Sequence, residues 1–494
     1  MTALPAQPVV HEVNTRVWLR EVTEQPGRPP AGLGDVPGEA WDALVPPGVD
    51  AVWLMGVWER SAEGRALALR DPELRRSFAE ALGEVRDEDV AGSPYCIRRY
   101  EVDAALGGAE GLAAARAALA TRGAGLILDY VPNHVAPDSP WAHEHPEDFV
   151  HGTAESEQSD PAAYLRVGGH VLARGRDPFF PPWPDVVQLN AFAPSMRRAT
   201  TDLLIRIGGM CDGVRCDMAM LLMNDIFAKT WGQSAGPPPR EDFWAAVLDG
   251  VLRHHPDMTF MAEAYWDLEW PLQQQGFGFC YDKRLYDRLL HENAASVRAH
   301  LTADESYQRR LVRFLENHDE PRAAAVLPAG KERAAAVVIA TVPGATLWHE
   351  GQFAGRRVRV PVFLTRRPDE RPDPALHAFH ERLLAAVHGS GMRTGRWRLL
   401  ECTGWPDNAS YHDILSWCWT GPAGRHLVAV NLSPRPAQAR IPLPWTELAA
   451  RHCRLTDVLA GDFHWDRSGE ELTGPGLYVG LEAWGAHVLA VEPG

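Results

Sequence analysis

Four short stretches of the chain combine acidic, basic and histidine side chains with apolar, strand-like surroundings. They are "LDYVPNH" (128–134), "DGVRCDMAM" (212–220), "MAEAYWD" (261–267) and "LENHDE" (315–320). The last three each supply one carboxylate, from Asp217, Glu263 and Asp319, to the end of a candidate strand. Carboxylates that are far apart in sequence, but that each follow a strand of the same sheet, can meet in one site and share acid–base chemistry.

Glycoside hydrolysis with retention uses two carboxyl groups about 5–5.5 Å apart, one as nucleophile and one as general acid and base. A third anionic group is useful because the transition state carries positive charge. Arg215 stands two residues before Asp217. A charge-assisted hydrogen bond from Arg215 is expected to orient Asp217 and to lower its pKa. The alternative for this pair taken alone is a buried structural ion pair.

Strands that alternate with helices predict the framework for these residues. The expected strands are 15–19, 51–55, 125–129, 213–217, 259–263, the region 276–280, 312–316 and 345–349. Helical segments such as "GLAAARAALATRG" and "KERAAAVVIATV" lie between them. Eight strands separated by helices indicate an α/β fold, a (β/α)8 TIM barrel, whose catalytic groups gather at the carboxyl ends of the strands.

Two regions depart from this alternation. Residues 136–195 are rich in Pro, Asp, His and aromatic residues, which predicts a long irregular insertion after the third strand. From about residue 390, short apolar runs joined by turns predict a small β-sandwich. The expected domains are therefore the barrel (1–135 and 196–388), the insertion (136–195) and a C-terminal β-sandwich (389–494).

The four stretches occur in order along the chain and together resemble the four signature regions of the α-amylase superfamily, glycoside hydrolase family 13. The resemblance covers roughly residues 14–365, and it implies that the insertion is the B domain of that family. It also implies roles for individual residues. Asp217 matches the nucleophile, Glu263 the general acid/base and Asp319 the third carboxylate, whereas Arg215, His134, His318, Tyr95 and Asp129 match substrate-binding or supporting positions.

The sequence departs from typical endo-acting α-amylases beside the nucleophile. Those enzymes carry Lys-His three and four residues after it, whereas this chain has Met220 and Leu221. The expected function is a retaining α-glycoside hydrolase acting on α-glucosides or α-glucan oligosaccharides through a covalent glycosyl-enzyme intermediate. A transglycosylase or sugar phosphorylase that uses the same site is the alternative. A non-catalytic, amylase-like binding protein and a metal-dependent hydrolase are weaker ones.

Composition restricts the partners. The chain has 494 residues and a net charge of −16, which argues against a nucleic-acid partner. The first residues do not predict a secretory signal, and we find no uninterrupted apolar run of about 18 residues, so we expect a cytoplasmic protein that does not bind membranes. The seven cysteines do not form close pairs, and no metal site is predicted from them. No cofactor is expected to be required, although the resemblance makes Ca²⁺ an optional ligand through Asn133. The sequence leaves the oligomeric state open.

Overall fold

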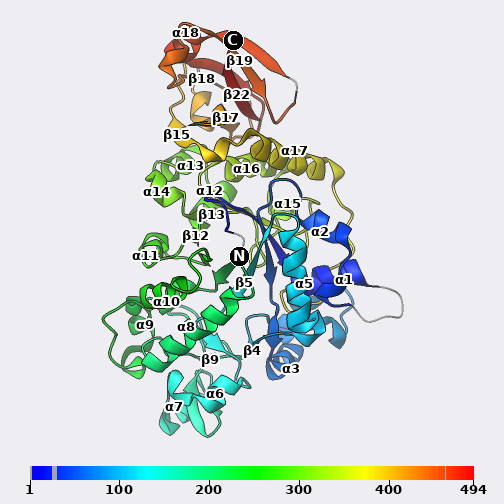
Figure 1. The fold of residues 1–494 in the computed structure, drawn as a ribbon, viewed down its shortest axis with the longest axis vertical. Helices are drawn as coiled ribbons and strands as arrows, with labels where there is room; N and C mark the ends of the chain where they lie inside the picture. Colours follow the sequence, from blue (N-terminus) through cyan, green and yellow to red (C-terminus); the bar gives the residue numbers. More distant parts are fainter. Residues whose placement is uncertain (1–2, 25–30, 462) are drawn as a thin grey trace.

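The computed structural model describes residues 3–24, 31–461 and 463–494. Its centre is a closed barrel in which eight parallel strands follow the order β1-β14-β13-β12-β11-β10-β5-β2 (Figure 1). These strands are β1 (Val9–Asn14), β2 (Ala51–Met55), β5 (Gly125–Tyr130), β10 (Gly213–Cys216), β11 (Thr259–Ala262), β12 (Phe279–Tyr281), β13 (Leu311–Arg313) and β14 (Ala345–His349). The predicted (β/α)8 barrel is confirmed.

One predicted strand is wrong. Residues 15–19 begin a helix, α1 (Thr15–Thr23), and the first barrel strand is the preceding β1. The Asn14 side chain accepts a hydrogen bond from the Val17 backbone N–H, which caps the start of this helix. An apolar run as short as "TRVWL" does not distinguish a strand from a buried helical turn, and here the cap decides.

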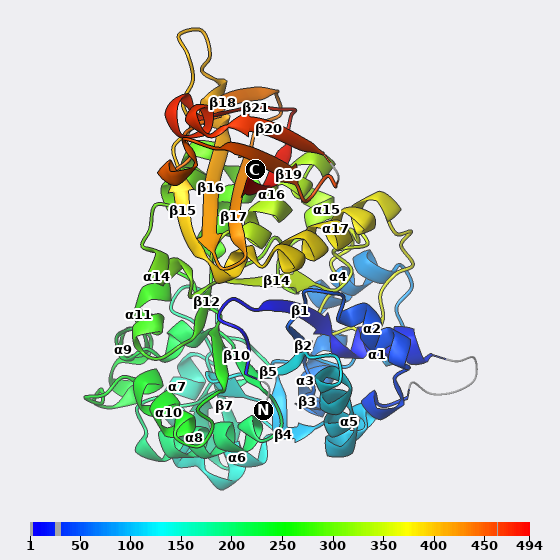
Figure 2. The same ribbon diagram turned by 45° about the horizontal axis from the view of Figure 1, so that its top comes forward.

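Helices cover the outside of the barrel (Figures 1 and 2). The longer ones that precede the C-terminal region are α3 (Ala62–Arg70), α4 (Pro72–Leu82), α5 (Gly108–Ala120), α8 (Pro194–Gly208), α9 (Asn224–Trp231), α10 (Phe243–Leu252), α12 (Lys283–His291) and α16 (Ala329–Thr341). Shorter ones are α2 (Gly38–Leu44), α11 (Glu269–Gln274), α13 (Ala294–His300), α14 (Glu305–Gln308) and α15 (Ala323–Val326). Helix α5 buries Leu112, Ala115 and Leu119, the spacing of a single helix face. Among the described residues, no helix is long and apolar enough to cross a membrane.

The insertion after the third barrel strand holds only short elements. They are β6 (His134–Val135), α6 (Pro140–Glu144), α7 (Ala154–Ser159), β7 (Tyr164–Val167), β8 (His170–Ala173) and β9 (Val187–Gln188). Strand β6 pairs with β9, so the insertion leaves and re-enters the barrel at neighbouring points. It occupies the lower end of the molecule in Figure 1. An inserted domain at this position is confirmed, and its limits of 136–195 stay a prediction.

The C-terminal region forms the predicted β-sandwich at the opposite end of the molecule (Figure 1). One sheet has six strands, β15 (Arg396–Leu400), β16 (Ile414–Gly421), β17 (Gly424–Asn431), β22 (Ala486–Pro493), β19 (His452–Asp457) and β20 (His464–Ser468). The other pairs β18 (Ala437–Ile441) with β21 (Leu477–Leu481). Helix α17 (Pro374–Ser390) precedes the sandwich. Trp417 and Trp419 donate hydrogen bonds to the Thr341 carbonyl of α16, which fixes the sandwich to the barrel.

Candidate active site

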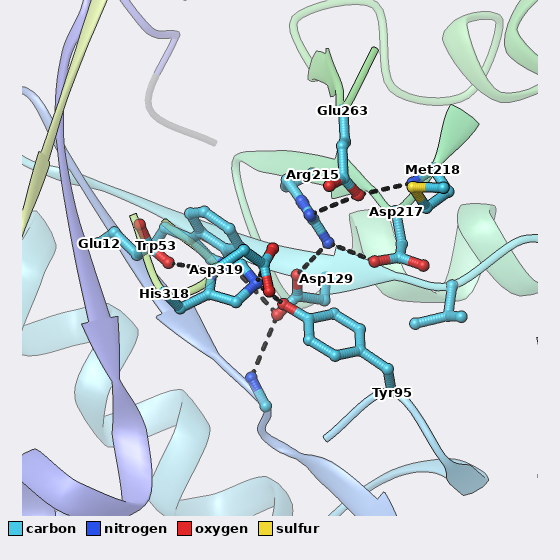
Figure 3. A network of polar contacts seen from close by, with 12 residues as sticks. Glu12, Trp53, Tyr95, Asp129, Arg215, Asp217, Met218, Glu263, His318 and Asp319 are labelled. Atoms are coloured by element: carbon cyan, nitrogen blue, oxygen red, sulfur yellow. Dashed lines mark hydrogen bonds and ion pairs between the residues drawn. The ribbon is translucent and has the colours of Figure 1, made fainter. Parts of the chain in front are cut away.

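Arg215 is the centre of a polar network at the carboxyl end of the barrel (Figure 3). Its Nη1 donates to Asp217 Oδ1 over 2.8 Å, and its Nη2 donates to Glu263 Oε2 over 2.7 Å. The guanidinium is fully buried. Trp53, Tyr95 and Tyr281 place their rings 5.2–5.7 Å from it. One buried cation therefore holds two carboxylates from adjacent strands, β10 and β11, at the same place.

The backbone turn after Asp217 also positions Glu263. Met218 adopts a left-handed conformation with φ 41°, which is uncommon for a residue other than glycine. This turn directs the Met218 N–H to Glu263 Oε2 at 2.8 Å. Tyr265 donates its hydroxyl proton to Glu263 Oε1, also at 2.8 Å. Both oxygens of Glu263 thus have partners, and the strained turn fixes the carboxyl group in the site.

The environment of Glu263 favours its protonated form. Burial is the largest cause of a pKa raised to about 7, and the Arg215 guanidinium works against it. The carboxylates of Asp217 and Asp319 add to the increase in pKa. The three acids predicted from separate stretches are thus close enough to act on one another's pKa, and Glu263 can carry a proton near neutral pH.

Asp217 differs from the expectation in one respect. Arg215 does act to lower its pKa, as expected, but burial outweighs this effect, and the pKa of Asp217 is raised above its ordinary value. The predicted net lowering is therefore wrong. The reason is physical: desolvation of a carboxylate at a buried position exceeds what one guanidinium shared with Glu263 restores. The hydrogen bond still fixes the orientation of Asp217.

His318 connects the third carboxylate to the barrel. Its Nδ1 hydrogen-bonds Glu12 of β1, and its Nε2 lies 2.9 Å from Asp319 Oδ2 and 2.7 Å from the Tyr95 hydroxyl. Burial alone would lower the pKa of His318, but Asp319 and Glu12 raise it well above its ordinary value. Burial would also raise the pKa of Asp319, and the His318 cation instead lowers it to about 2. Asp319 is therefore a stable anion.

Asp129 supports the arginine from the neighbouring strand. Its Oδ1 lies 3.6 Å from Arg215 Nη1, and the two residues are register partners of β5 and β10. Its Oδ2 accepts hydrogen bonds from the Trp53 indole and the Gly56 backbone N–H, each at 3.1 Å. Asp129 is buried, and its carboxylate contacts Arg215, Trp53 and Gly56. These contacts are those expected of a structural partner of the arginine.

His134 lies at the edge of this network. Its buried ring packs edge-on against Trp183 of the insertion, with centroids 5.2 Å apart. Burial lowers the pKa of His134 to about 4, although Asp185 and the Tyr95 backbone act in the opposite direction. His134 is thus a neutral side chain next to Tyr95, and Tyr95 itself joins the network through His318.

Asn133, the predicted optional calcium ligand, has a protein partner in this structure, and the calcium role stays a prediction. Its amide nitrogen donates to Gln188 Oε1 at 3.1 Å, and its Oδ1 accepts from Gln188 Nε2 at 2.9 Å. These hydrogen bonds connect the residue before β6 to Gln188 of β9. Within the described ranges, no group of three or more His, Cys, Asp or Glu side chains is arranged to hold a metal ion.

The sequence did not identify Glu12 or Trp53 as site residues. Glu12 is completely buried in β1, whose sequence is "VVHEVN". An acidic residue within a mostly apolar run is a signal that the sequence does contain, because such an acid is buried only where it has a partner. A first strand predicted at 15–19 rather than at β1 leaves Glu12 outside the barrel. Trp53 was recognised only as part of a strand, since its indole contact with Asp129 depends on the pairing of distant strands.

Comparisons with known proteins agree with this architecture. No family model matches the chain. The crystal structure of a maltogenic α-amylase, AmyB from Thermotoga neapolitana, superposes with a TM-score of 0.69 over 99% of both chains at 18% identity. The chain has the α-amylase fold. The fold implied by the resemblance to the α-amylase superfamily is thereby confirmed.

Two further proteins, one found by sequence and one by structure, are similar to this chain. The α-amylase MalA of Haloarcula japonica is 25% identical over 396 residues, which cover 77% of this chain and 48% of MalA. The chain thus spans about half the length of that relative. A trehalulose synthase, MutB, has the same fold with a TM-score of 0.67, 16% identity and 99% coverage of both chains. The fold alone therefore does not specify the reaction.

Proposed function

We propose that this protein is a retaining α-glycoside hydrolase of the α-amylase type, acting on α-glucosides or α-gluco-oligosaccharides. The observation that carries the proposal is the Arg215 guanidinium that hydrogen-bonds both Asp217 and Glu263. Two carboxyl groups on one guanidinium suit the short separation of retaining enzymes, roughly 5–5.5 Å, better than the wider gap of inverting ones. The α-amylase fold and the similarity to MalA support the same substrate class.

In this proposal Asp217 attacks the anomeric carbon while Glu263 gives its proton to the glycosidic oxygen. The pKa of Glu263, about 7, allows the proton to be present before bond cleavage. The covalent glycosyl-Asp217 ester forms as the leaving group departs. Glu263, now ionised, takes a proton from water, and that water releases the sugar with its original anomeric configuration.

The remaining groups stabilise the sugar and its developing charge. Asp319 remains an anion beside His318 and binds sugar hydroxyls near the anomeric centre. Arg215 holds Asp217 in its attacking orientation, and Tyr95, held by His318, lies beside the same sugar. Their joint effect is electrostatic preorganisation, which is a large source of rate acceleration.

The proposal is tested with p-nitrophenyl α-glucoside and malto-oligosaccharides, using wild-type protein and Asp217→Asn. We expect the wild type to release the α-anomer first, as seen by NMR, and the variant to lose at least about 10⁴-fold in kcat. A β-anomer, or equal activity in the variant, would refute it.

A second outcome uses the same residues with another acceptor. A sugar in place of water gives transglycosylation, and phosphate gives a sugar 1-phosphate. Met220 and Leu221 are buried core residues, so the hydrogen bonds that Lys-His makes in typical endo-acting α-amylases are absent here. The product profile with maltose, sucrose, trehalose and isomaltose, with and without phosphate, distinguishes transfer and phosphorolysis from hydrolysis. The cytoplasmic location stays a prediction.

A further inference from the structure

The loop after β14 is strongly basic, although the whole chain has a net charge of −16. Residues 356–371 contain six arginines and only two acidic residues. Three of the arginines form ion pairs with carboxylates, namely Arg356, Arg366 and Arg367. The other three are exposed and have no carboxylate within 4 Å in the described part of the chain; they are Arg357, Arg359 and Arg371. A positive patch on an acidic protein attracts anions to that place.

The paired arginines and the backbone fix this loop against the loop after β2. Leu364 forms an antiparallel bridge with Val90. Arg366 donates two hydrogen bonds to Asp89, at 2.8 and 3.0 Å. The loop thus has a defined place at the carboxyl end of the barrel, and its unpaired arginines project from a fixed backbone.

Arg359 lies beside the third carboxylate of the site. Its Nη1 donates to the main-chain carbonyl of Asp319 at 2.7 Å, and Arg357 donates to the Ala324 carbonyl of the same loop after β13. A carbonyl fixes a guanidinium without neutralising its charge. The Asp319 carboxylate has its own partner in His318, at 2.9 Å. Arg359 therefore keeps donors for an oxyanion, which a guanidinium binds in a two-point geometry.

A second cation without an acidic partner lies on the same side. Arg60 ends β3 (Trp58–Arg60), which follows β2, and it is only 7% exposed. Its Nη1 donates to the carbonyls of Gly92 and Val362 at 2.7 and 3.3 Å, whereas its Nε and Nη2 have no partner among the described atoms. Burial lowers the pKa of Arg60 to about 9, so it remains a cation at neutral pH. Since a buried charge without a counterion is costly, its presence indicates a function for positive potential here.

The topology shows which part of a bound sugar faces these cations. Strand β14 lies opposite β10 in the closed barrel, and Asp217 directly follows β10. In a pyranose, C4 and the exocyclic C6 lie at the end of the ring away from C1. With C1 at Asp217, this far end is directed across the barrel mouth, toward the loops after β13 and β14. Glu263 follows β11, next to β10, so the leaving group lies on the other side.

We propose that the glucosyl unit transferred to Asp217 carries an oxyanion at C6, a phosphate or a carboxylate, and that Arg359 binds this group. Arg357 and Arg60 add positive potential on the same side of the cleft. C6 carries the primary hydroxyl, which can be esterified or oxidised while the ring hydroxyls stay intact. The inference rests on the proposed function and names its substrate class: charged α-glucosides are preferred to neutral ones.

The test uses three substrates that share one leaving group and differ only at C6: p-nitrophenyl α-glucoside, its 6-phosphate and p-nitrophenyl α-glucuronide. We expect kcat/KM of the wild type to be at least about tenfold higher for one of the charged substrates than for the neutral one. Whichever is preferred identifies the oxyanion. This preference should become smaller at high ionic strength, because the exposed Arg359 charge is then screened.

The decisive variant is Arg359→Gln, which removes the charge but keeps a donor for the Asp319 carbonyl. We expect it to lose at least about tenfold in kcat/KM on the preferred charged substrate and to stay within about twofold of wild type on the neutral one. The matched control is Arg371→Gln. Arg371 is an exposed arginine of the same loop that makes no hydrogen bond to the loop after β13 within the described ranges, and its loss should change neither value.

Three outcomes would contradict the inference. Equal activity of the wild type on all three substrates, or a preference for the neutral one, would overturn it and leave the proposed function standing. Equal losses of Arg359→Gln on charged and neutral substrates would also overturn it, since a structural role gives that pattern. A wild type inactive on all three would overturn the proposed function as well.

Discussion

Replacing Glu263 with glutamine is expected to make the protein more stable at alkaline pH, although it abolishes the acid/base. The pKa of Glu263 is about 7 in the folded protein against an ordinary value of 4.5. Between these values the folded state keeps a proton that the unfolded state has lost, so folding stability decreases as the pH rises from about 4.5 to above 7. The difference in pKa corresponds to about 3 kcal/mol. Glutamine cannot ionise and avoids this loss.

The structure indicates that glutamine fits. Its carbonyl oxygen can accept from Arg215 and the Met218 N–H, and its amide can donate to the Tyr265 hydroxyl. The assay is thermal unfolding of wild type and Glu263→Gln at pH 5 and pH 8. We expect the difference in Tm, variant minus wild type, to increase by about 2 °C or more between the two pH values.

The control is Glu155→Gln, which removes an exposed carboxylate of α7 and should show no such increase. The reasoning would be refuted if the Tm difference for Glu263→Gln were the same at both pH values or became smaller at pH 8. Either result would mean that Glu263 is as easily ionised in the folded protein as in the unfolded chain.

Three other predictions follow from the same network. Activity of the wild type should decrease as the pH rises through about 7, because Glu263 loses the proton that it must donate; a kcat/KM profile that is flat from pH 6 to 8.5 would contradict this. Glu12→Gln should lower the pKa of His318 and reduce kcat/KM by up to about 100-fold through misplacement of Asp319, whereas Glu155→Gln should not; unchanged kinetics would remove Glu12 from the site. Trp53→Phe should lower the free energy of unfolding by about 1–3 kcal/mol, since Asp129 loses a buried hydrogen-bond donor; an unchanged Tm would argue against that contact.

Much of the framework could be predicted because barrel strands are short apolar runs with clear limits. Strands β2 and β14 coincide with the predicted 51–55 and 345–349, and the carboxylates follow their strands as expected. The first strand was misplaced because "TRVWL" has the composition of a strand and its helical state depends on the Asn14 cap. Local composition is a weak guide where a cap or a tertiary contact decides the conformation.

The electrostatics of the site was less predictable than its residues. The spacing of Arg215 and Asp217 correctly suggested an ion pair, but the sign of the net pKa change depends on how deeply Asp217 is buried and on Glu263 sharing the same guanidinium. The aromatic pair of Phe179 and Trp266 joins residues 87 positions apart along the chain, through a loop whose path the sequence does not reveal. Such features arise from the assembled fold and not from any one segment.

Covalent trapping tests the central assignment most directly. A 5-fluoro-α-glucosyl fluoride allows the first step and slows the second, so the glycosyl-enzyme should accumulate and can be located by peptide mass spectrometry. We predict a single adduct on Asp217, with none in Asp217→Asn. An adduct on Glu263 or Asp319, or turnover of the reagent with no adduct on any carboxylate, would contradict the account.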